Sequence, residues 1–258
     1  MDEIKKDIRQ YIKDNKAILN DFGKFEIPNL FSLGEGGNGL VYICKINNTE
    51  FAIKFLAENS TQKLERFKAE YLNLCYYKDE LKNIVNNIYY GCVTINGKSV
   101  PYIIMKKYIC NLKKYRQNKK DITWEDIERL LWSLLESLEA MEKCKIIHRD
   151  LKPENIFVDQ NNNYIIADFG IAHFNCENAP IANLTVNGER LANYYFSAPE
   201  QASRGEADFS SDLYSAAQVI HWFAFGETNR GIPTRHLNVM YEDTLETRCL
   251  DIIIHWCL

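Results

Sequence analysis

The sequence has no apolar run long enough to cross a membrane, no C-x-x-C pair and no excess of basic residues. Its longest apolar stretches, 219–225 and 252–254, fall short of the roughly 20 residues that a membrane helix needs. A net charge of −4 argues against a nucleic-acid partner. The eight scattered cysteines predict reduced thiols rather than disulfides or a zinc site. Because the N-terminus also has no signal-peptide core, we expect a cytoplasmic protein without a membrane segment.

Hydrophobic periodicity divides the chain into a strand-rich first part and a helix-rich second part. An amphipathic helix is predicted within residues 2–19, and Pro28 introduces extended chain. Strands are predicted at 30–33, 40–46, 50–56, 88–95 and 102–108, with one helix from Asn59 or Ser60 to Tyr77. Short strands then lie at 156–158 and 164–167, among helices at 123–141, 211–225 and 244–258; Thr123 and Asp126 form a predicted capping box. We therefore expect an α+β fold with an N-terminal helical extension (1–27), a small antiparallel β lobe (28–108) and a larger, mainly helical lobe (109–258).

A glycine-rich segment, Gly34-Glu35-Gly36-Gly37-Asn38-Gly39, lies between two of these strands. Glycine lets backbone N–H groups approach phosphates closely. A dinucleotide site would need a helix after the glycines, whereas a strand follows here. This order favours a β-hairpin over the phosphates of a nucleotide. Taken alone, the segment is explained equally well as a tight glycine turn.

Lys54 ends the strand segment Phe51-Ala52-Ile53-Lys54. A lysine in an alternating strand usually points to solvent, but beside a phosphate loop it can contact the α- and β-phosphates. Glu70 lies on the apolar face of the next predicted helix, where a carboxylate is unusual unless it is paired. We therefore predict an ion pair between Lys54 and Glu70.

Three oxygen-bearing side chains, Asp150, Asn155 and Asp168, lie near predicted strand ends. Carboxylate and amide oxygens suit Mg²⁺, and Asp150 could accept the proton of an attacking hydroxyl group. Each residue alone could be an ordinary turn or cap residue. Their combination with Lys152 and the glycine segment is poorly explained by chance.

With these motifs in this order, the chain resembles a eukaryotic-type (Hanks-type) serine/threonine protein kinase over about residues 28–258, a form also found in bacteria. The motifs are the glycine loop, Lys54, His148-Arg149-Asp150-Leu151-Lys152-Pro153-Glu154-Asn155, Asp168-Phe169-Gly170 and Ser197-Ala198-Pro199-Glu200. Lys152-Pro153-Glu154 is the serine/threonine form of the loop. The resemblance implies a bilobal kinase fold, ATP and Mg²⁺ as cofactors (Mn²⁺ as the alternative metal), a protein substrate and autophosphorylation.

The resemblance also implies a role for each matching residue. Asp150 would be the catalytic base, and Lys152 would steady the γ-phosphate. Lys54 would hold the α- and β-phosphates while paired with Glu70, and Asn155 and Asp168 would hold the metal. The implied nucleotide-binding residues are Gly34, Glu35, Gly36, Gly37, Asn38, Gly39, Val41, Ala52, Lys54, Met105 as gatekeeper, Lys106 and Tyr108 as the hinge, and Phe157. Asp212 matches a family aspartate that supports the catalytic loop.

Several residues imply unusual regulation. In the family, the arginine that matches Arg149 commonly receives a phosphate from the activation segment. Thr185 is the predicted acceptor, and Glu189 competes with it as a built-in acidic mimic. Asn193 replaces the threonine that the family usually has. The chain stops before the family helix whose arginine pairs with the glutamate matched by Glu200, so no such partner is found; the large lobe is expected to be either truncated or naturally short at its C-terminus. The apolar end, Ile252–Leu258, would then be exposed or covered by a partner.

Two other functions remain alternatives to an active kinase. One is a pseudokinase or scaffold that binds nucleotide or a protein, although every expected catalytic side chain is present. The other is a phosphotransferase of the aminoglycoside type, whose relatives typically lack the Ala198-Pro199-Glu200 segment. Basic residues after the hinge are interpreted as a solvated surface, with a preference for acidic substrates as the alternative: Lys113, Lys114, Arg116, Lys119 and Lys120.

Overall fold

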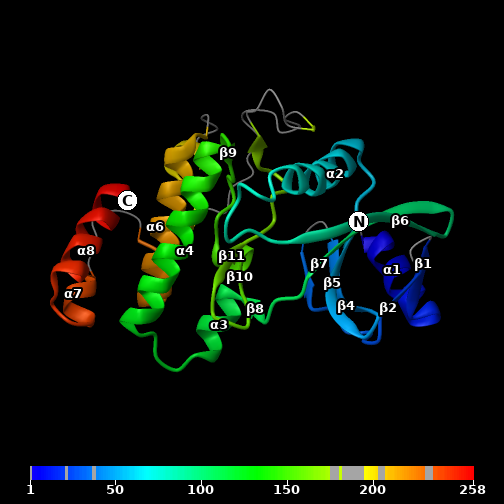
Figure 1. The fold of residues 1–258 in the computed structure, drawn as a ribbon, viewed down its shortest axis with the longest axis horizontal. Coiled ribbons are helices and arrows are strands. Elements are labelled where there is room, and N and C mark those ends of the chain that lie inside the picture. Colours follow the sequence, from blue (N-terminus) through cyan, green and yellow to red (C-terminus); the bar gives the residue numbers. More distant parts are fainter. Residues whose placement is uncertain are drawn as a thin grey trace. The chain divides into compact units, whose positions relative to one another are not determined.

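The computed structural model describes residues 2–20, 23–36, 39–174, 180–181, 195–202, 207–229 and 235–258 (Figure 1). It divides into a first unit, Met1–Lys78 with Val85–Tyr108, and a second unit, Asp79–Ile84 with Ile109–Leu258. The first unit holds an antiparallel sheet and the second is mainly helical, so the predicted α+β fold is confirmed. Within the described ranges, no helix is both long and apolar enough to cross a bilayer.

The first unit is built on one seven-stranded sheet with the order β1-β2-β4-β5-β7-β6, and β3 beside β4. Helix α1 (Asp2–Asn15) precedes the sheet and α2 (Thr61–Tyr76) follows β5. The strands are β1 (Ala17–Asn20), β2 (Gly23–Glu26), β3 (Gly34–Glu35), β4 (Gly39–Ile46), β5 (Thr49–Leu56), β6 (Asn87–Ile95) and β7 (Lys98–Lys106). The strand predicted at 30–33 is wrong: these residues are bent or irregular, and the two-residue β3 pairs with β4 instead.

Strand alternation gives this sheet two different faces. On one face, α1 buries Ile4, Ile8 and Ile12 in a core cluster that includes Leu40 and Phe55. The spacing of these isoleucines matches one side of a helix, and their burial explains why α1 is seated on the sheet.

The opposite face carries the strand residues whose side chains point away from this core. Val41 is opposite Lys54, and Ala52 is opposite Met105, in the strand register. Helix α2 lies on this second face, because its Glu70 bonds the side chain of Lys54. The sheet therefore separates α1 from the face that carries Lys54.

The second unit packs α4 against α6 and places two small sheets beside them, in the orders β11-β10-β8 and β12-β9. Helix α4 begins with the predicted capping box, in which Thr123 and Asp126 bond each other's backbone N–H groups. The elements are β8 (Cys110–Asn111), α3 (Leu112–Asn118), α4 (Trp124–Lys143), β9 (Ile146–Ile147), the 3-10 turn η1 (Pro153–Asn155), β10 (Ile156–Val158), β11 (Tyr164–Ile166), β12 (His173–Phe174), α5 (Pro199–Ala202), α6 (Phe209–Phe225), α7 (Leu237–Met240) and α8 (Leu245–Cys257).

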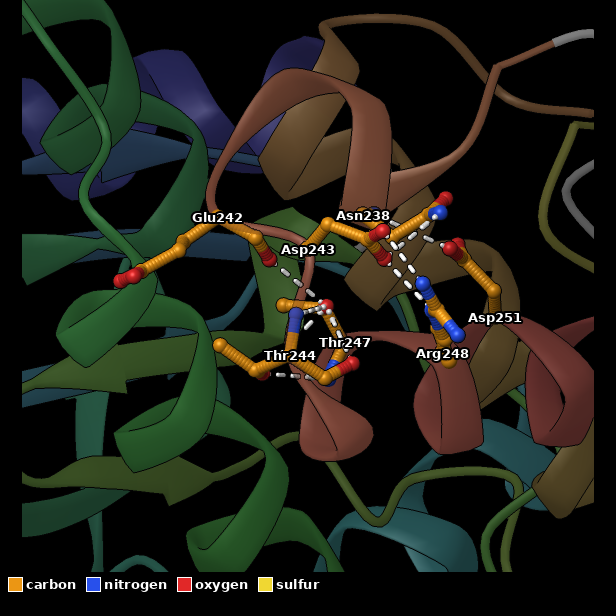
Figure 2. Close-up of polar contacts among 7 residues, drawn as sticks. All are labelled: Asn238, Glu242, Asp243, Thr244, Thr247, Arg248 and Asp251. Atoms are coloured by element: carbon orange, nitrogen blue, oxygen red, sulfur yellow. Dashed lines mark hydrogen bonds and ion pairs between the residues drawn. The ribbon is translucent and has the colours of Figure 1, made fainter.

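Helices α7 and α8 are joined by polar contacts that Figure 2 shows in close-up. The carboxylate of Asp251 in α8 accepts hydrogen bonds from the backbone N–H groups of Leu237 (2.7 Å) and Asn238 (3.1 Å) at the start of α7. Thr244 and Thr247 form a capping box at the start of α8. The same helix exposes Ile252, Ile253 and Trp256, so among the described residues the C-terminal helix has apolar side chains in solvent.

Candidate active site

The predicted ion pair of the first unit is present. Lys54 Nζ lies 3.1 Å from both carboxylate oxygens of Glu70. The Glu70 side chain is only 3% exposed, against 22% for Lys54, and the ring of Phe67 lies 5.7 Å from the ammonium group. Burial of the carboxylate makes the pair costly to break, since the remaining charge would be left without its partner. Lys54 is thus a fixed positive charge on its face of the sheet.

The glycines of the glycine segment differ in what surrounds them. At Gly39 an added Cβ would lie 2.3 Å from the backbone oxygen of Phe55, so this glycine is required by the close approach of β5. At Gly34 and Gly36 an added Cβ would meet no described atom within 4 Å. Among the described residues, no atom therefore lies against the exposed face of these two glycines, and a ligand could approach their backbone closely. Gly37 and Asn38 lie outside the described residues.

Glu35, predicted to be part of the nucleotide loop, uses its side chain on helix α1. Lys5 Nζ lies 3.1 Å from Oε1, and an Arg9 guanidinium nitrogen lies 2.6 Å from Oε2. These two donors lower the pKa of Glu35, Lys5 contributing most, and so hold the carboxylate ionised. Sequence reasoning missed Lys5 and Arg9. The available signal was their spacing of one helical turn beside the isoleucine stripe of α1.

The predicted adenine-binding residues lie in both units. Val41, Ala52 and Met105 share the Lys54 face of the first sheet, and Phe157 lies on β10 of the second unit. At the predicted hinge, the Lys106 N–H donates to the Asn86 carbonyl (3.0 Å). This N–H is therefore already bonded within the first unit. Figure 1 shows the strands that carry these residues.

In the second unit, Asp150 receives several hydrogen bonds. Its Oδ2 accepts from Lys152 Nζ at 2.6 Å and from Asn155 Nδ2 at 2.9 Å. The same Asn155 nitrogen also donates to the Asp150 carbonyl at 2.9 Å. The Asp150 N–H donates to His148 Nδ1 at 3.2 Å. This geometry fixes the carboxylate while Lys152 holds a positive charge directly beside it.

Burial raises the pKa of Asp150 to about 6, although the positive charge of Lys152 lowers it. The negative charge of Asp168 is a further influence that raises this pKa. Asp150 is therefore a stronger base than an exposed aspartate and is still ionised at neutral pH. Such a carboxylate can accept a proton from an attacking hydroxyl group.

The backbone of the catalytic loop is held by the buried Asp212 of α6. Its two carboxylate oxygens accept the backbone N–H groups of His148 (2.6 Å) and Arg149 (2.9 Å). Burial raises the pKa of Asp212 to about 7, and these two N–H groups oppose the rise. Arg149 has a positive φ of 69°, a strained conformation for a non-glycine residue. The hydrogen bond from its N–H to Asp212 helps to maintain that conformation.

His148 connects this loop to the Asp168-Phe169-Gly170 segment. Its Nε2 lies 3.1 Å from the Ala167 carbonyl, and its ring contacts Phe169 edge-on at 4.6 Å. Burial lowers the pKa of His148 to about 4, so the ring is neutral at pH 7. The Ala167 N–H also donates to the Asn155 carbonyl at 2.8 Å. Asp168, which follows Ala167 with a positive φ of 66°, is thus held next to the catalytic loop.

The oxygen donors at this point suit a divalent metal ion supported by a phosphate ligand. The Asn155 nitrogen donates twice to Asp150, so Oδ1 is the atom of that side chain that could bind a metal ion. Asp168 supplies a carboxylate. The described residues contain no cluster of three or more His, Cys, Asp or Glu side chains that could hold a metal alone. One carboxylate and one amide, completed by water and phosphate oxygens, is the ligand set that Mg²⁺ accepts.

Two polar side chains hold the Ser197–Glu200 segment in place. Gln201 donates to the Arg149 carbonyl at 3.0 Å and accepts from the Ala198 N–H at 3.1 Å. Glu200, for which the sequence offered no arginine partner, accepts a hydrogen bond from the Ser211 hydroxyl at 2.5 Å. Sequence reasoning missed both contacts, because single Gln and Ser residues give no pattern signal. Thr185, Glu189 and Asn193 lie outside the described residues.

The basic residues after the hinge are largely engaged within the second unit. Lys113 pairs with Glu154 at 2.8 Å, and Lys119 pairs with Asp126. Arg116 donates to the Phe223 carbonyl at 2.8 Å and lies 5.5 Å from the Trp222 ring. These contacts favour a structural role for this group over recognition of acidic substrates.

Comparison with known proteins supports the resemblance to protein kinases. The family model described as "Protein kinase domain" matches residues 29–246. A G-type lectin S-receptor-like serine/threonine-protein kinase of Arabidopsis thaliana is 33% identical over 80% of this chain and 25% of its own length. Cysteine-rich receptor-like protein kinase 11 of the same plant is 29% identical over 86% of this chain and 33% of its own length.

A bacterial relative is also similar. A probable serine/threonine-protein kinase of Clostridium perfringens is 31% identical over 75% of this chain and 28% of its own length. The chain spans a third or less of the length of these three relatives. The match to the family model covers most of the chain, and it includes the glycine loop, Lys54 and the loop around Asp150. The chain therefore belongs to the protein kinase domain family.

Proposed function

We propose that the chain is a serine/threonine protein kinase that transfers the γ-phosphate of ATP to a hydroxyl group of a protein. The observation that carries the proposal is the geometry around Asp150. One carboxylate oxygen is held by Lys152 at 2.6 Å and by Asn155 at 2.9 Å, and the pKa of the acid is raised but stays below neutral pH. The serine/threonine specificity rests on Lys152-Pro153-Glu154 and on the relatives, which are named as serine/threonine-protein kinases.

In this reaction Asp150 orients the substrate hydroxyl and accepts its proton. The hydroxyl oxygen forms a bond to the γ-phosphorus, the bond from that phosphorus to the β,γ-bridging oxygen breaks, and ADP leaves with the electron pair. Lys152 places a positive charge beside the transferred group, and Lys54, held by Glu70, binds the α- and β-phosphates. Positioning and charge stabilisation supply most of the rate enhancement.

The proposal includes Mg²⁺, with Mn²⁺ as an alternative, held by Asn155 and Asp168. When bound, the ion neutralises negative charge on the phosphates. The protein's own contribution is to orient the ligands: Asn155 through its bonds to Asp150, and Asp168 through the contacts of the preceding Ala167. The open space above Gly34 and Gly36 supports phosphate binding under the glycine loop.

We also propose how the activity is regulated. Arg149 would receive a phosphate added by autophosphorylation, with Thr185 as the acceptor, or Glu189 would replace that phosphate. A partner covering the C-terminal end is not part of the proposed function, since no observation identifies what would cover the exposed side chains of α8. The cytoplasmic location expected from the sequence stays a prediction.

The test is transfer of ³²P from labelled ATP to the chain itself and to a general protein substrate, followed by phosphoamino-acid analysis. Label on serine or threonine that is lost in Lys54→Met and Asp150→Asn would support the proposal. Label of equal strength in these variants, or none with the wild type, would refute it. Mass spectrometry on the fully active enzyme separates the regulatory alternatives: phosphate on Thr185 favours autophosphorylation, and an unmodified activation segment favours Glu189.

A further inference from the structure

We propose that helix α1 is a positioning device for the glycine loop, and that Lys5 and Arg9 set the affinity for the nucleotide without taking part in the transfer step. The inference rests on the proposed function, because it assumes that the loop covers ATP phosphates. It concerns the first unit alone, in which α1, the glycine loop and the Lys54 face all lie. No residue of α1 belongs to the kinase motifs, and the family match begins only at residue 29.

Helix α1 is firmly seated on the sheet. Ile8 and Ile12 are at most 1% exposed and lie in the same core cluster as Leu40 and Tyr42 of β4. At the other edge of the helix, Asp7 accepts a hydrogen bond from Asn96 in the β6–β7 turn at 3.0 Å. Burial of several isoleucine side chains stabilises this arrangement far more than a surface contact would. The helix can therefore act as a rigid support.

From this support, three hydrogen bonds reach the start of the glycine loop. Lys5 Nζ binds the Gly36 carbonyl at 2.9 Å and Glu35 Oε1 at 3.1 Å, and Arg9 binds Glu35 Oε2 at 2.6 Å. The Lys5 side chain is 8% exposed, whereas those of Arg9 and Glu35 are 45% and 44% exposed. Lys5 thus binds both the Glu35 side chain and the Gly36 carbonyl. Because Lys5 is buried, its contacts are stronger than the contact of the exposed Arg9.

These bonds arrive from the side of the sheet that is opposite Lys54. The core cluster beneath α1 contains Leu40 and Phe55, whereas Val41 and Lys54 point to the other face. The Gly36 carbonyl is held toward α1, so the loop is restrained without any side chain of α1 entering the space on the phosphate side. An added Cβ at Gly36 would meet nothing described within 4 Å, and that space is thus left for the ligand.

The physical consequence is a lower entropic cost of nucleotide binding. A glycine-rich loop loses more conformational freedom on ordering than other sequences do. When α1 restrains the loop beforehand, ATP no longer has to supply that ordering energy, and its affinity rises. Chemistry at Asp150 is unaffected, because neither Lys5 nor Arg9 belongs to the catalytic loop.

The experiment measures steady-state kinetics of the full chain carrying Lys5→Met and Arg9→Met together. We expect KM for Mg-ATP to rise about tenfold and kcat to change less than about twofold, as loss of charge-assisted hydrogen bonds to the loop would produce. The matched control is Lys6→Met with Lys13→Met, two exposed lysines of the same helix, which should leave both constants unchanged. Arg9→Lys alone, which keeps a donor at this site and leaves Lys5 in place, should keep most of the wild-type affinity.

Coupling to Glu35 separates this positioning role from a general loss of stability. Glu35→Gln added to the double variant should raise KM no further, since both changes remove the same contacts. If the double variant has a clearly lower melting temperature than the wild type, the KM of Glu35→Gln alone, a change at a half-exposed site, provides the same test. An unchanged KM in an active enzyme, or additive effects of the two sets of changes, would overturn the inference.

Hydrogen exchange distinguishes failure of this inference from failure of the proposed function. Without nucleotide, the amide of Gly36, which bonds the Gly39 carbonyl at 3.1 Å, should exchange faster in the double variant than in the wild type. If the double variant exchanges faster but the wild type cannot transfer phosphate, the kinase proposal is refuted and the positioning role of α1 is preserved. Equal exchange rates would overturn that role whatever the activity.

Discussion

The catalytic loop at His148–Asn155 and the glycine loop at 34–36 and 39 are held in different ways. The catalytic loop is fixed by buried partners, with Asp212 accepting two backbone N–H groups and Asn155 bonding Asp150 twice. The glycine loop depends on half-exposed Glu35 and on Lys5 from α1. Buried hydrogen bonds are costly to remove, whereas exposed ion pairs contribute little and are screened by salt. The comparison suggests one loop built for fixed geometry and another built for adjustable affinity.

The largest effect on activity should come from changing Asp150, the proposed base of the catalytic loop. Asp150→Asn keeps the size of the side chain but removes the base, so kcat should fall by about 10³-fold or more. The change should leave the melting temperature nearly unchanged, since an amide can still contact Asn155. Single-turnover phosphate transfer measures it. A residual rate within about tenfold of the wild type would contradict the assigned role of Asp150.

The support beneath that loop should show the next largest effect. Asp212→Ala leaves the buried N–H groups of His148 and Arg149 without their acceptor, which should lower the free energy of unfolding by about 2–4 kcal/mol. Urea denaturation measures this loss. Asp212→Asn, which keeps one acceptor oxygen, serves as the matched control and should lose less. Equal stability of the alanine variant and the wild type would mean that the loop is not held by Asp212.

A shift in pH dependence tests the electrostatics of the catalytic loop. Asp150 must be ionised to accept a proton, so kcat/KM should rise with pH through an acidic limb near the pKa of about 6. Lys152 lowers that pKa, and Lys152→Ala should therefore move the limb to higher pH. The profile of each enzyme between about pH 5 and 9 measures the shift. A limb that stays in place or moves to lower pH would show that Lys152 does not act on Asp150 in this way.

The smallest effect concerns salt and the glycine loop. The Arg9–Glu35 pair is half-exposed and weakens as ionic strength rises, so the KM difference between the wild type and the variant Lys5→Met with Arg9→Met should become smaller at roughly 0.5 M NaCl. The effect of Lys54→Met on nucleotide binding should persist, because Glu70 is buried. Titration with a fluorescent nucleotide at several salt concentrations measures both. Equal salt sensitivity would remove the distinction between the two loops.

Much of the fold and the candidate site could be predicted from local patterns. The α4 capping box and the Lys54–Glu70 pair each depend on residues whose spacing along the chain carries the signal. The contacts that were missed depend on tertiary structure. The Lys5–Glu35 contact joins residues 30 positions apart, and no periodicity connects a helix to a loop on another element. The strand predicted at 30–33 failed because apolar residues there, such as Phe31, are exposed rather than buried in a sheet.

The position of Asp212 in the sequence affects when the protein can become active during its synthesis. His148 receives its backbone partner from a residue 64 positions further along the chain. During synthesis, a chain that ended before α6 would already contain every residue of the catalytic loop and yet lack the carboxylate that holds it. We therefore expect the ability to transfer phosphate to appear late on the ribosome, only after α6 has emerged and packed. A nascent kinase would in this way stay inactive until most of its second unit has been built.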